Sequence, residues 1–191
     1  MQNRFRGADV ISWVEQEPDF QVRPLNVLLP RLRFSTAASL WSRSGARLLI
    51  LVDQAVRDQI ERHLATRRIE QGGLLLGSAY RASPGASTVV TVEDAVAAAD
   101  ALGTGVSLTM ASQVWEDARA RSTAQRTVIG WYHSHPDLGA FFSGTDRHTQ
   151  RAFFGNAHSI GLVSDPVRKE ERWFSGPESV EVPAGDRLLL S

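Results

Sequence analysis

Two histidines, a serine and an aspartate lie close together in one stretch, GWYHSHPDLGAFFSGTD, which runs from Gly130 to Asp146. His133 and His135 are two residues apart, and Ser143 precedes Asp146 by three. Two imidazoles and a carboxylate are ligand types that zinc accepts, and three protein ligands with one open position are typical of catalytic zinc. Such zinc lowers the pKa of a bound water from about 15.7 toward about 7. The stretch therefore predicts a hydrolytic zinc site, for which a general base must come from elsewhere in the chain.

Each half of this pattern also has a purely structural explanation. A His-x-His pair can lie at the end of a strand without binding anything, and Ser-x-x-Asp at the start of a helix is a common capping arrangement. The other three histidines, His63, His148 and His158, have no companion pattern and are expected to be core or surface residues. The metal hypothesis depends on the two halves occurring together.

The elements around these residues must bring their side chains to one place. Side chains two apart on a strand point to the same side, so a strand that ends near His135 turns both imidazoles toward one pocket. Pro136 has no N–H group and should stop the sheet ladder. Gly139 allows an unusual turn conformation. A helix that begins at Ser143 places Ser143 and Asp146 on one face, toward the histidines.

The rest of the chain predicts a mixed sheet with helices packed on it, which belongs to the α/β (α+β) class. Asp53 is a good N-cap, because it follows an apolar run and precedes residues with helical spacing. Ser112 is expected to cap a second helix. The predicted strands cover residues 47–52, 72–81, 88–98, 105–110, 126–133, 158–165 and 170–174, and the predicted helices cover residues 54–68, the segment after Ser112, and 144–154.

Composition narrows the classes of function. The 191 residues carry 21 basic and 21 acidic side chains without a long block of one sign, so no nucleic-acid or membrane partner is expected. The chain contains 0 cysteines, so a metal must be held by His, Asp or Glu. Neither a signal peptide nor a membrane span is evident, which favours a cytoplasmic protein. Residues 1–45 contain prolines and a serine-rich passage, and we expect them to form an extension or small subdomain. The predicted domain then covers residues 46–175, and residues 176–191 are expected to form a tail.

His-Ser-His-Pro, followed after six residues by Ser-x-x-Asp, resembles the signature of the JAMM (MPN+) metalloprotease family, and the preceding GWY resembles its lead-in. That family also carries a glutamate at the end of its first helix, before a strand rich in glycine and leucine. IEQGGLLLG at 69–77 is similar, with Glu70 in the glutamate position. The resemblance covers about residues 46–175 and implies the JAMM/MPN (cytidine deaminase-like) fold.

The resemblance also implies a role for each residue. His133, His135 and Asp146 would bind one Zn²⁺ per chain. Glu70 would take a proton from the zinc water and later pass it to the leaving amine. Ser143 would donate its hydroxyl to the oxyanion of the tetrahedral intermediate.

Members of this family hydrolyse the amide after the C-terminus of ubiquitin or a ubiquitin-like protein. The resemblance thus implies a zinc isopeptidase or peptidase whose partners are ubiquitin-like proteins or their conjugates, together with activating and conjugating enzymes of the same pathway. The short chain favours a bacterial version. Two alternatives stay open: a protease that trims the tail of a sulfur-carrier protein, and a non-catalytic scaffold or binding module. Asp137 and the lack of cysteine in the loop depart from many relatives and leave the choice of substrate open.

Overall fold

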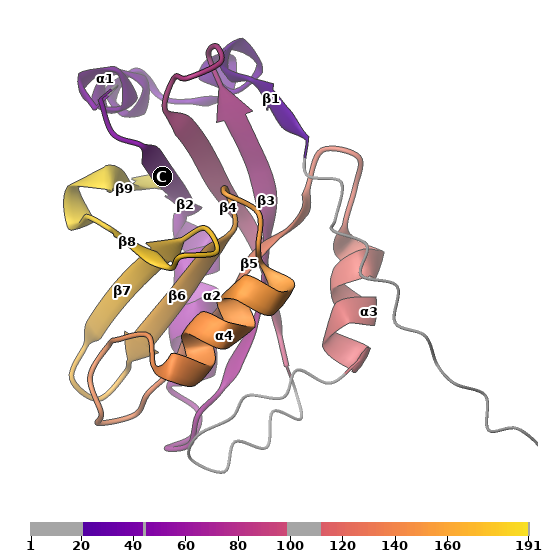
Figure 1. Cartoon of the computed structure of the whole chain (residues 1–191), viewed down its shortest axis with the longest axis vertical. Coiled ribbons are helices and arrows are strands. Elements are labelled where there is room, and N and C mark those ends of the chain that lie inside the picture. The colour runs from indigo at the N-terminus through magenta and orange to yellow at the C-terminus, as the bar shows by residue number, and fades with distance from the viewer. Residues whose placement is uncertain (1–20, 44, 99–111, 191) are drawn as a thin grey trace, which may run out of the picture.

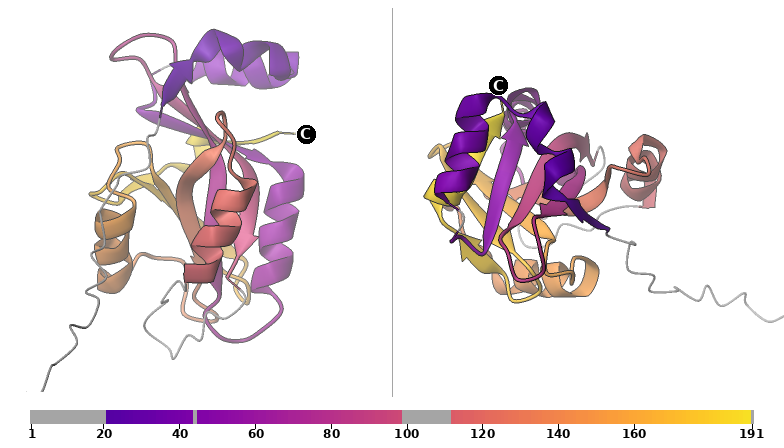
Figure 2. Two further views of the ribbon diagram at one scale, coloured as in Figure 1. Left: turned by 90° about the vertical axis from the view of Figure 1, so that its right-hand side faces the viewer. Right: turned by 90° about the horizontal axis from the view of Figure 1, so that it is seen from above.

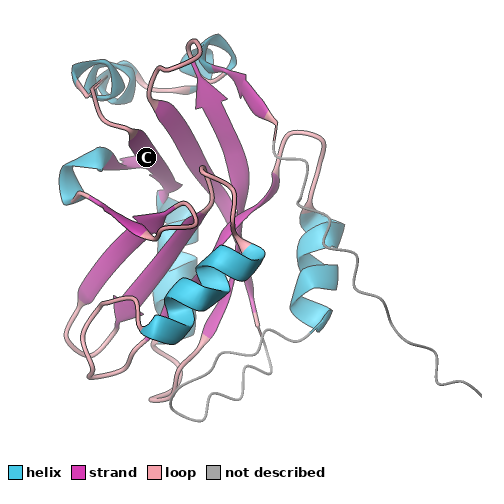
Figure 3. Ribbon diagram, viewed as in Figure 1, coloured by secondary structure: helices cyan, strands magenta, loops and turns pink. Residues whose placement is uncertain are grey.

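A computed structural model describes residues 21–43, 45–98 and 112–190 of the chain. Figure 3 shows where its helices and strands lie. In chain order they are β1 (Val22–Pro24), the short helices η1 (Leu25–Val27) and η2 (Leu29–Arg31), α1 (Phe34–Ser42), β2 (Leu48–Asp53), α2 (Gln54–Leu64), β3 (Gly72–Arg81), β4 (Thr88–Ala97), α3 (Ser112–Arg121), β5 (Thr127–Ser134), α4 (Gly144–Phe153), β6 (Ile160–Asp165), β7 (Glu170–Ser175), β8 (Val180–Val182), η3 (Ala184–Asp186) and β9 (Arg187–Leu190).

The described strands form one mixed sheet, in the order β8-β7-β6-β5-β3-β4-β2-β9, with β1 beside the end of β3 (Figure 1). β3 is antiparallel to both β4 and β5, whereas β5 and β6 are parallel. β3 is the most buried of the long strands, as expected for a strand with neighbours on both edges and side chains packed on both faces. The mixed sheet flanked by helices confirms the predicted fold class.

Helices cover the sheet on both sides. α2 and α4 lie on opposite sides of the sheet, as Figure 1 and Figure 2 show. The apolar stripe of α2, formed by Val56, Ile60 and Leu64, packs into the core cluster that contains Leu75 and Ile129 of the sheet. A second cluster on the other face joins α3 to the sheet through residues of β3, β5 and β7, and it includes Val114, Ala118, Leu74, Trp131 and Phe174.

Most predicted elements agree with the structure to within two residues, but α2, the first of the predicted helices, ends earlier than expected. It was expected over 54–68, and it ends at Leu64. The Thr66 hydroxyl donates to the carbonyl of His63 at 2.7 Å, and the Gln71 side-chain oxygen accepts from the Arg67 N–H at 3.2 Å. These polar side chains satisfy backbone groups at the helix end and turn the chain toward β3.

Both segments that flank the predicted domain pack on the sheet. Leu28 and Leu40, from residues 1–45, join a third apolar cluster with residues of β2, β3 and β4. The last residues, predicted as a tail, form β8 and β9, and β9 pairs in parallel with β2. The boundaries near 45 and 175 stay predictions, and the strand predicted over 105–110 lies outside the described residues. Among the described helices, none combines the length and apolar character that a membrane span requires.

Candidate metal centre

β5 delivers two imidazoles to one place. His133 lies in β5 and His135 directly follows the strand, and the His135 N–H still donates to the carbonyl of Ser164 on β6 at 2.9 Å. Their Nε2 atoms are 3.2 Å apart, so the expectation that both rings face one side is confirmed. Both side chains are almost fully buried. Trp131 stacks on the ring of His133 at 4.5 Å between centroids, and its indole N–H donates to Gln150 of α4 at 2.7 Å.

The loop after β5 turns sharply and leads into α4. Gly139 has φ of +89°, in the left-handed region that glycine tolerates best. α4 then begins with a capping box: the Ser143 Oγ accepts from the Asp146 N–H at 3.2 Å, and the Asp146 carboxylate accepts from the Ser143 N–H at 2.6 Å. The structural explanation of Ser-x-x-Asp is therefore realised, and the same cap fixes the Asp146 side chain beside the histidines.

The three candidate ligands converge at the spacing of a metal site. Asp146 Oδ1 lies 3.3 Å from His133 Nε2, and Asp146 Oδ2 lies 3.6 Å from His135 Nε2. All three residues are buried. A tetrahedral zinc with ligands at about 2.0–2.1 Å places its ligand atoms about 3.3–3.4 Å from one another. The separations of 3.2, 3.3 and 3.6 Å fit that geometry, and the donor set of two nitrogens and one oxygen fits zinc.

The protonation states that the site favours also suit a cation. Burial raises the pKa of Asp146, but interactions with His133 and Ser143 outweigh burial and hold it at about 2, so the carboxylate is ionised at neutral pH. Burial and the neighbouring His133 lower the pKa of His135 and favour the neutral imidazole, which is the form that binds metals. Burial raises the pKa of Glu70.

Glu70 reaches the same site from the loop before β3. Its Oε1 lies 3.8 Å from His135 Nε2, and its side chain is only 11% exposed. The register explains this approach, because Gly72 of β3 pairs with His133 of β5. All five residues singled out in the sequence therefore lie together, although Ser143 stands at the rim through its helix cap.

Two residues that the sequence did not single out support the site. Ser134, between the two histidines, is fully buried, and its Oγ accepts from the Gln71 N–H at 3.1 Å. The Ser134 N–H donates to the Gln71 carbonyl at 2.8 Å. These bonds fix the backbone next to Glu70. The Ser in His-Ser-His-Pro was a visible signal, but its partner depends on strand pairing.

Asp165, at the end of β6, organises the loop that follows His135. This fully buried carboxylate accepts hydrogen bonds from the backbone N–H groups of Asp137 at 3.0 Å and Gly139 at 2.7 Å. It also accepts from the N–H groups of Val167 and Arg168 at 2.9 and 3.1 Å. Burial raises the pKa of Asp165, but these four bonds outweigh burial and lower it below its ordinary value. Nothing in the local sequence around Asp165 indicated this role.

Comparison with known proteins identifies the family. The model for prokaryotic homologs of the JAB domain matches residues 53–175, which is more than half of the chain. The chain belongs to this family. The resemblance to the JAMM/MPN proteins is thus confirmed, and the mixed sheet flanked by helices is consistent with the JAB/MPN fold.

The relatives include deubiquitinases. The chain is 35% identical over 71 residues to "Ubiquitin carboxyl-terminal hydrolase RPN11" of Saccharomyces cerevisiae, a match that covers 35% of this chain and 23% of that protein. It is 30% identical over 148 residues to the histone deubiquitinase MYSM1 of Branchiostoma floridae, covering 73% of this chain and 17% of the relative. The chain thus spans less than a quarter of the length of these relatives.

A solved structure supports the fold. The solution structure of protein DSY2949 from Desulfitobacterium hafniense superposes with a TM-score of 0.52 at 16% identity, covering 74% of this chain and 92% of that one. At this identity the likeness speaks for the fold alone.

Proposed function

We propose that the chain is a zinc-dependent isopeptidase or peptidase that hydrolyses the amide bond after the C-terminus of a ubiquitin-like protein. The observation that carries this proposal is the buried cluster of His133, His135 and Asp146, spaced as ligands of one tetrahedral ion, with the Glu70 carboxylate beside it. One zinc per chain would be held by the three ligands.

The residues around the ion divide the chemistry between them. When bound, zinc would supply Lewis acidity, which polarises a carbonyl and lowers the pKa of water toward about 7. Glu70 would accept a proton from the attacking water and pass it to the leaving amine. The Ser143 Oγ accepts a hydrogen bond in the helix cap, so its own O–H group stays able to donate to the carbonyl oxygen of the scissile bond. Removing such a donor costs about 2.7–4 kcal/mol of transition-state stabilisation.

The surroundings of the site support a peptide substrate. Leu138 and Phe141, in the loop after His135, are 59% and 46% exposed, and Ile69, next to Glu70, is 38% exposed. These apolar side chains suit the extended tail of a ubiquitin-like protein, and the names of the deubiquitinase relatives favour the same class of substrate. The proposal extends to a bacterial, cytoplasmic enzyme that works beside activating and conjugating enzymes.

The test is cleavage of a panel of ubiquitin, ubiquitin-like and sulfur-carrier fusions by the zinc-loaded chain. Glu70→Gln keeps the size of the side chain and is expected to lower cleavage by about 10²–10⁴-fold. Glu61→Gln, at an exposed position of α2, is the matched control and should leave the rate within about twofold of wild type. A chelator should abolish cleavage and added zinc should restore it.

The outcomes separate the alternatives. Preferential cleavage of the sulfur-carrier fusion would favour the trimming protease. A zinc-loaded chain that binds a fusion but cleaves none of them would indicate a scaffold. Equal rates for wild type and Glu70→Gln would contradict the role of Glu70.

A further inference from the structure

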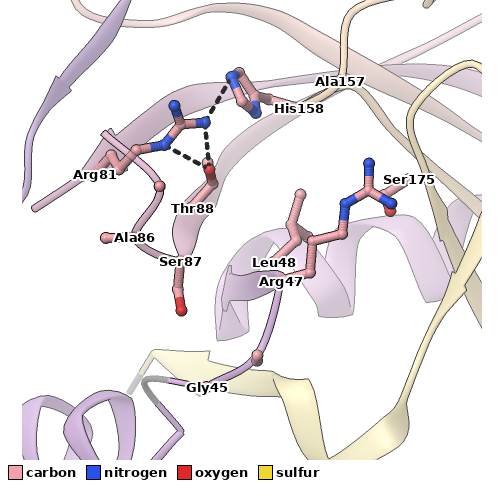
Figure 4. Close-up of a pocket in the computed structure, with 12 residues that line it drawn as sticks. Gly45, Arg47, Leu48, Arg81, Ala86, Ser87, Thr88, Ala157, His158 and Ser175 are labelled. Carbon is pink, nitrogen blue, oxygen red and sulfur yellow. Dashed lines mark hydrogen bonds between the residues drawn. The ribbon is translucent and has the colours of Figure 1, made fainter. Parts of the chain in front are cut away.

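A second hollow lies away from the metal centre. It has a volume of about 520 Å³, and residues from the start of β2, the β3–β4 turn, the loop before β6 and the end of β7 line it (Figure 4). β3 begins at Gly72, beside His133, and ends at Arg81, which lines the hollow. Ten residues of strand span about 30 Å, so the hollow is at the opposite end of the sheet from the metal ligands.

The hollow is positively charged. Arg47, Arg81 and His158 line it, and none of its lining residues is acidic. The guanidinium of Arg81 donates to the Thr88 hydroxyl at 2.8 and 3.1 Å and lies 3.2 Å from His158 Nε2. Within the described part of the chain, neither Arg47 nor Arg81 forms an ion pair with a carboxylate. Two guanidinium groups that share one hollow without a counter-charge favour an anion there.

The donors approach from different directions. Figure 4 shows Arg81 beside Thr88 and His158 on one side, whereas Arg47 extends toward Ser175 on the other. A planar carboxylate is satisfied by one bidentate arginine, but a phosphoryl group offers three oxygens arranged around phosphorus and accepts from several sides. This distribution of donors therefore suits a phosphoryl group better than a carboxylate.

Part of the remaining wall is apolar, and the rest includes Ser87 and Ser175. Ala46, Leu48, Ala86 and Ala157 contribute to the apolar part, and Leu48 belongs to the main core cluster. The volume of about 520 Å³ is in the range of small-molecule sites. We propose that this hollow binds a small phosphate ester, with Arg47 and Arg81 on the phosphoryl group and the apolar wall against the organic part. This site is independent of the peptidase function proposed above.

The experiment is calorimetric titration of the zinc-loaded 191-residue chain with inorganic phosphate and with adenosine 5′-monophosphate. We expect saturable binding of both, with the ester at least fivefold tighter. Arg81→Gln and Arg47→Gln should each weaken binding at least tenfold. Arg119→Gln, an exposed arginine on α3, is the matched control and should leave the Kd within twofold.

Binding of both probes that is unchanged in the Arg47 and Arg81 variants would overturn the proposal, because it would place the anion elsewhere, for example on the zinc. Absence of saturable phosphate binding up to about 10 mM would overturn it too, and equal affinity for the two probes would overturn the assignment of an ester. Arg47 is exposed, so its variant keeps the test valid even if Arg81→Gln lowers the Tm.

Discussion

Replacing Asp165 by asparagine is expected to destabilise the fold, because this carboxylate holds the loop after β5 together. One of its oxygens accepts hydrogen bonds from the backbone N–H groups of Asp137, Val167 and Arg168, and the other accepts one from the N–H of Gly139. An asparagine can keep its oxygen toward the first three donors, but its NH₂ group then faces the Gly139 N–H. The variant loses one bond to a charged group and weakens three others, which corresponds to about 2–4 kcal/mol of unfolding free energy.

Urea denaturation in the presence of a chelator measures this free energy without a contribution from bound metal. Asp137→Asn is the matched control, because the Asp137 side chain is 74% exposed and its ion pair with Arg168 is at the surface. Asparagine also tolerates the φ of +63° at this position. We expect the control to change the unfolding free energy by less than about 0.5 kcal/mol. A loss below about 1 kcal/mol in Asp165→Asn would refute the role assigned to this carboxylate.

Asp165 should also make the stability depend on pH, and Gly73 and Ser134 are two further positions where a substitution tests the structure. The pKa of Asp165 in the folded state lies below its ordinary value of 3.8, so its ionised carboxylate stabilises the fold above that pH. This stabilisation is lost as the pH falls through the folded-state pKa. In acid titrations, the free energy of unfolding should therefore fall less steeply below about pH 4 in Asp165→Asn than in wild type. Gly73→Ala should destabilise the sheet by about 1–3 kcal/mol in thermal unfolding, because a Cβ there would collide with the Val96 carbonyl, whereas Gly185→Ala has open space and should be near neutral. Ser134→Ala removes a buried acceptor beside the candidate base, and we expect cleavage to fall through kcat while zinc affinity stays within about threefold of wild type; an unchanged kcat would argue against a positioning role.

The sequence predicted the parts of the site that depend on local geometry. The alternation of side chains along a strand placed His133 and His135 on one side, and helix spacing placed Ser143 with Asp146. Glu70 could be assigned only through the family resemblance, because its approach to His135 depends on the pairing of β3 with β5.

Features that depend on distant segments escaped prediction. Asp165 lies 28 residues after Asp137 in the loop that it holds, and its role depends on β6 lying beside β5. The strand β9 pairs with β2 from the other end of the chain, and its four residues are too few for a periodic pattern. The hollow between Arg47 and Arg81 likewise forms only when strand ends far apart in sequence come together.

Zinc titration of the purified, metal-free chain tests most directly whether His133, His135 and Asp146 form a metal centre. We expect one zinc per chain, and Asp146→Asn should weaken binding by about 100-fold or more. Asp58→Asn, at an exposed position of α2, should not change it. Zinc binding that is absent from the wild type, or that is equally strong in Asp146→Asn, would contradict the account.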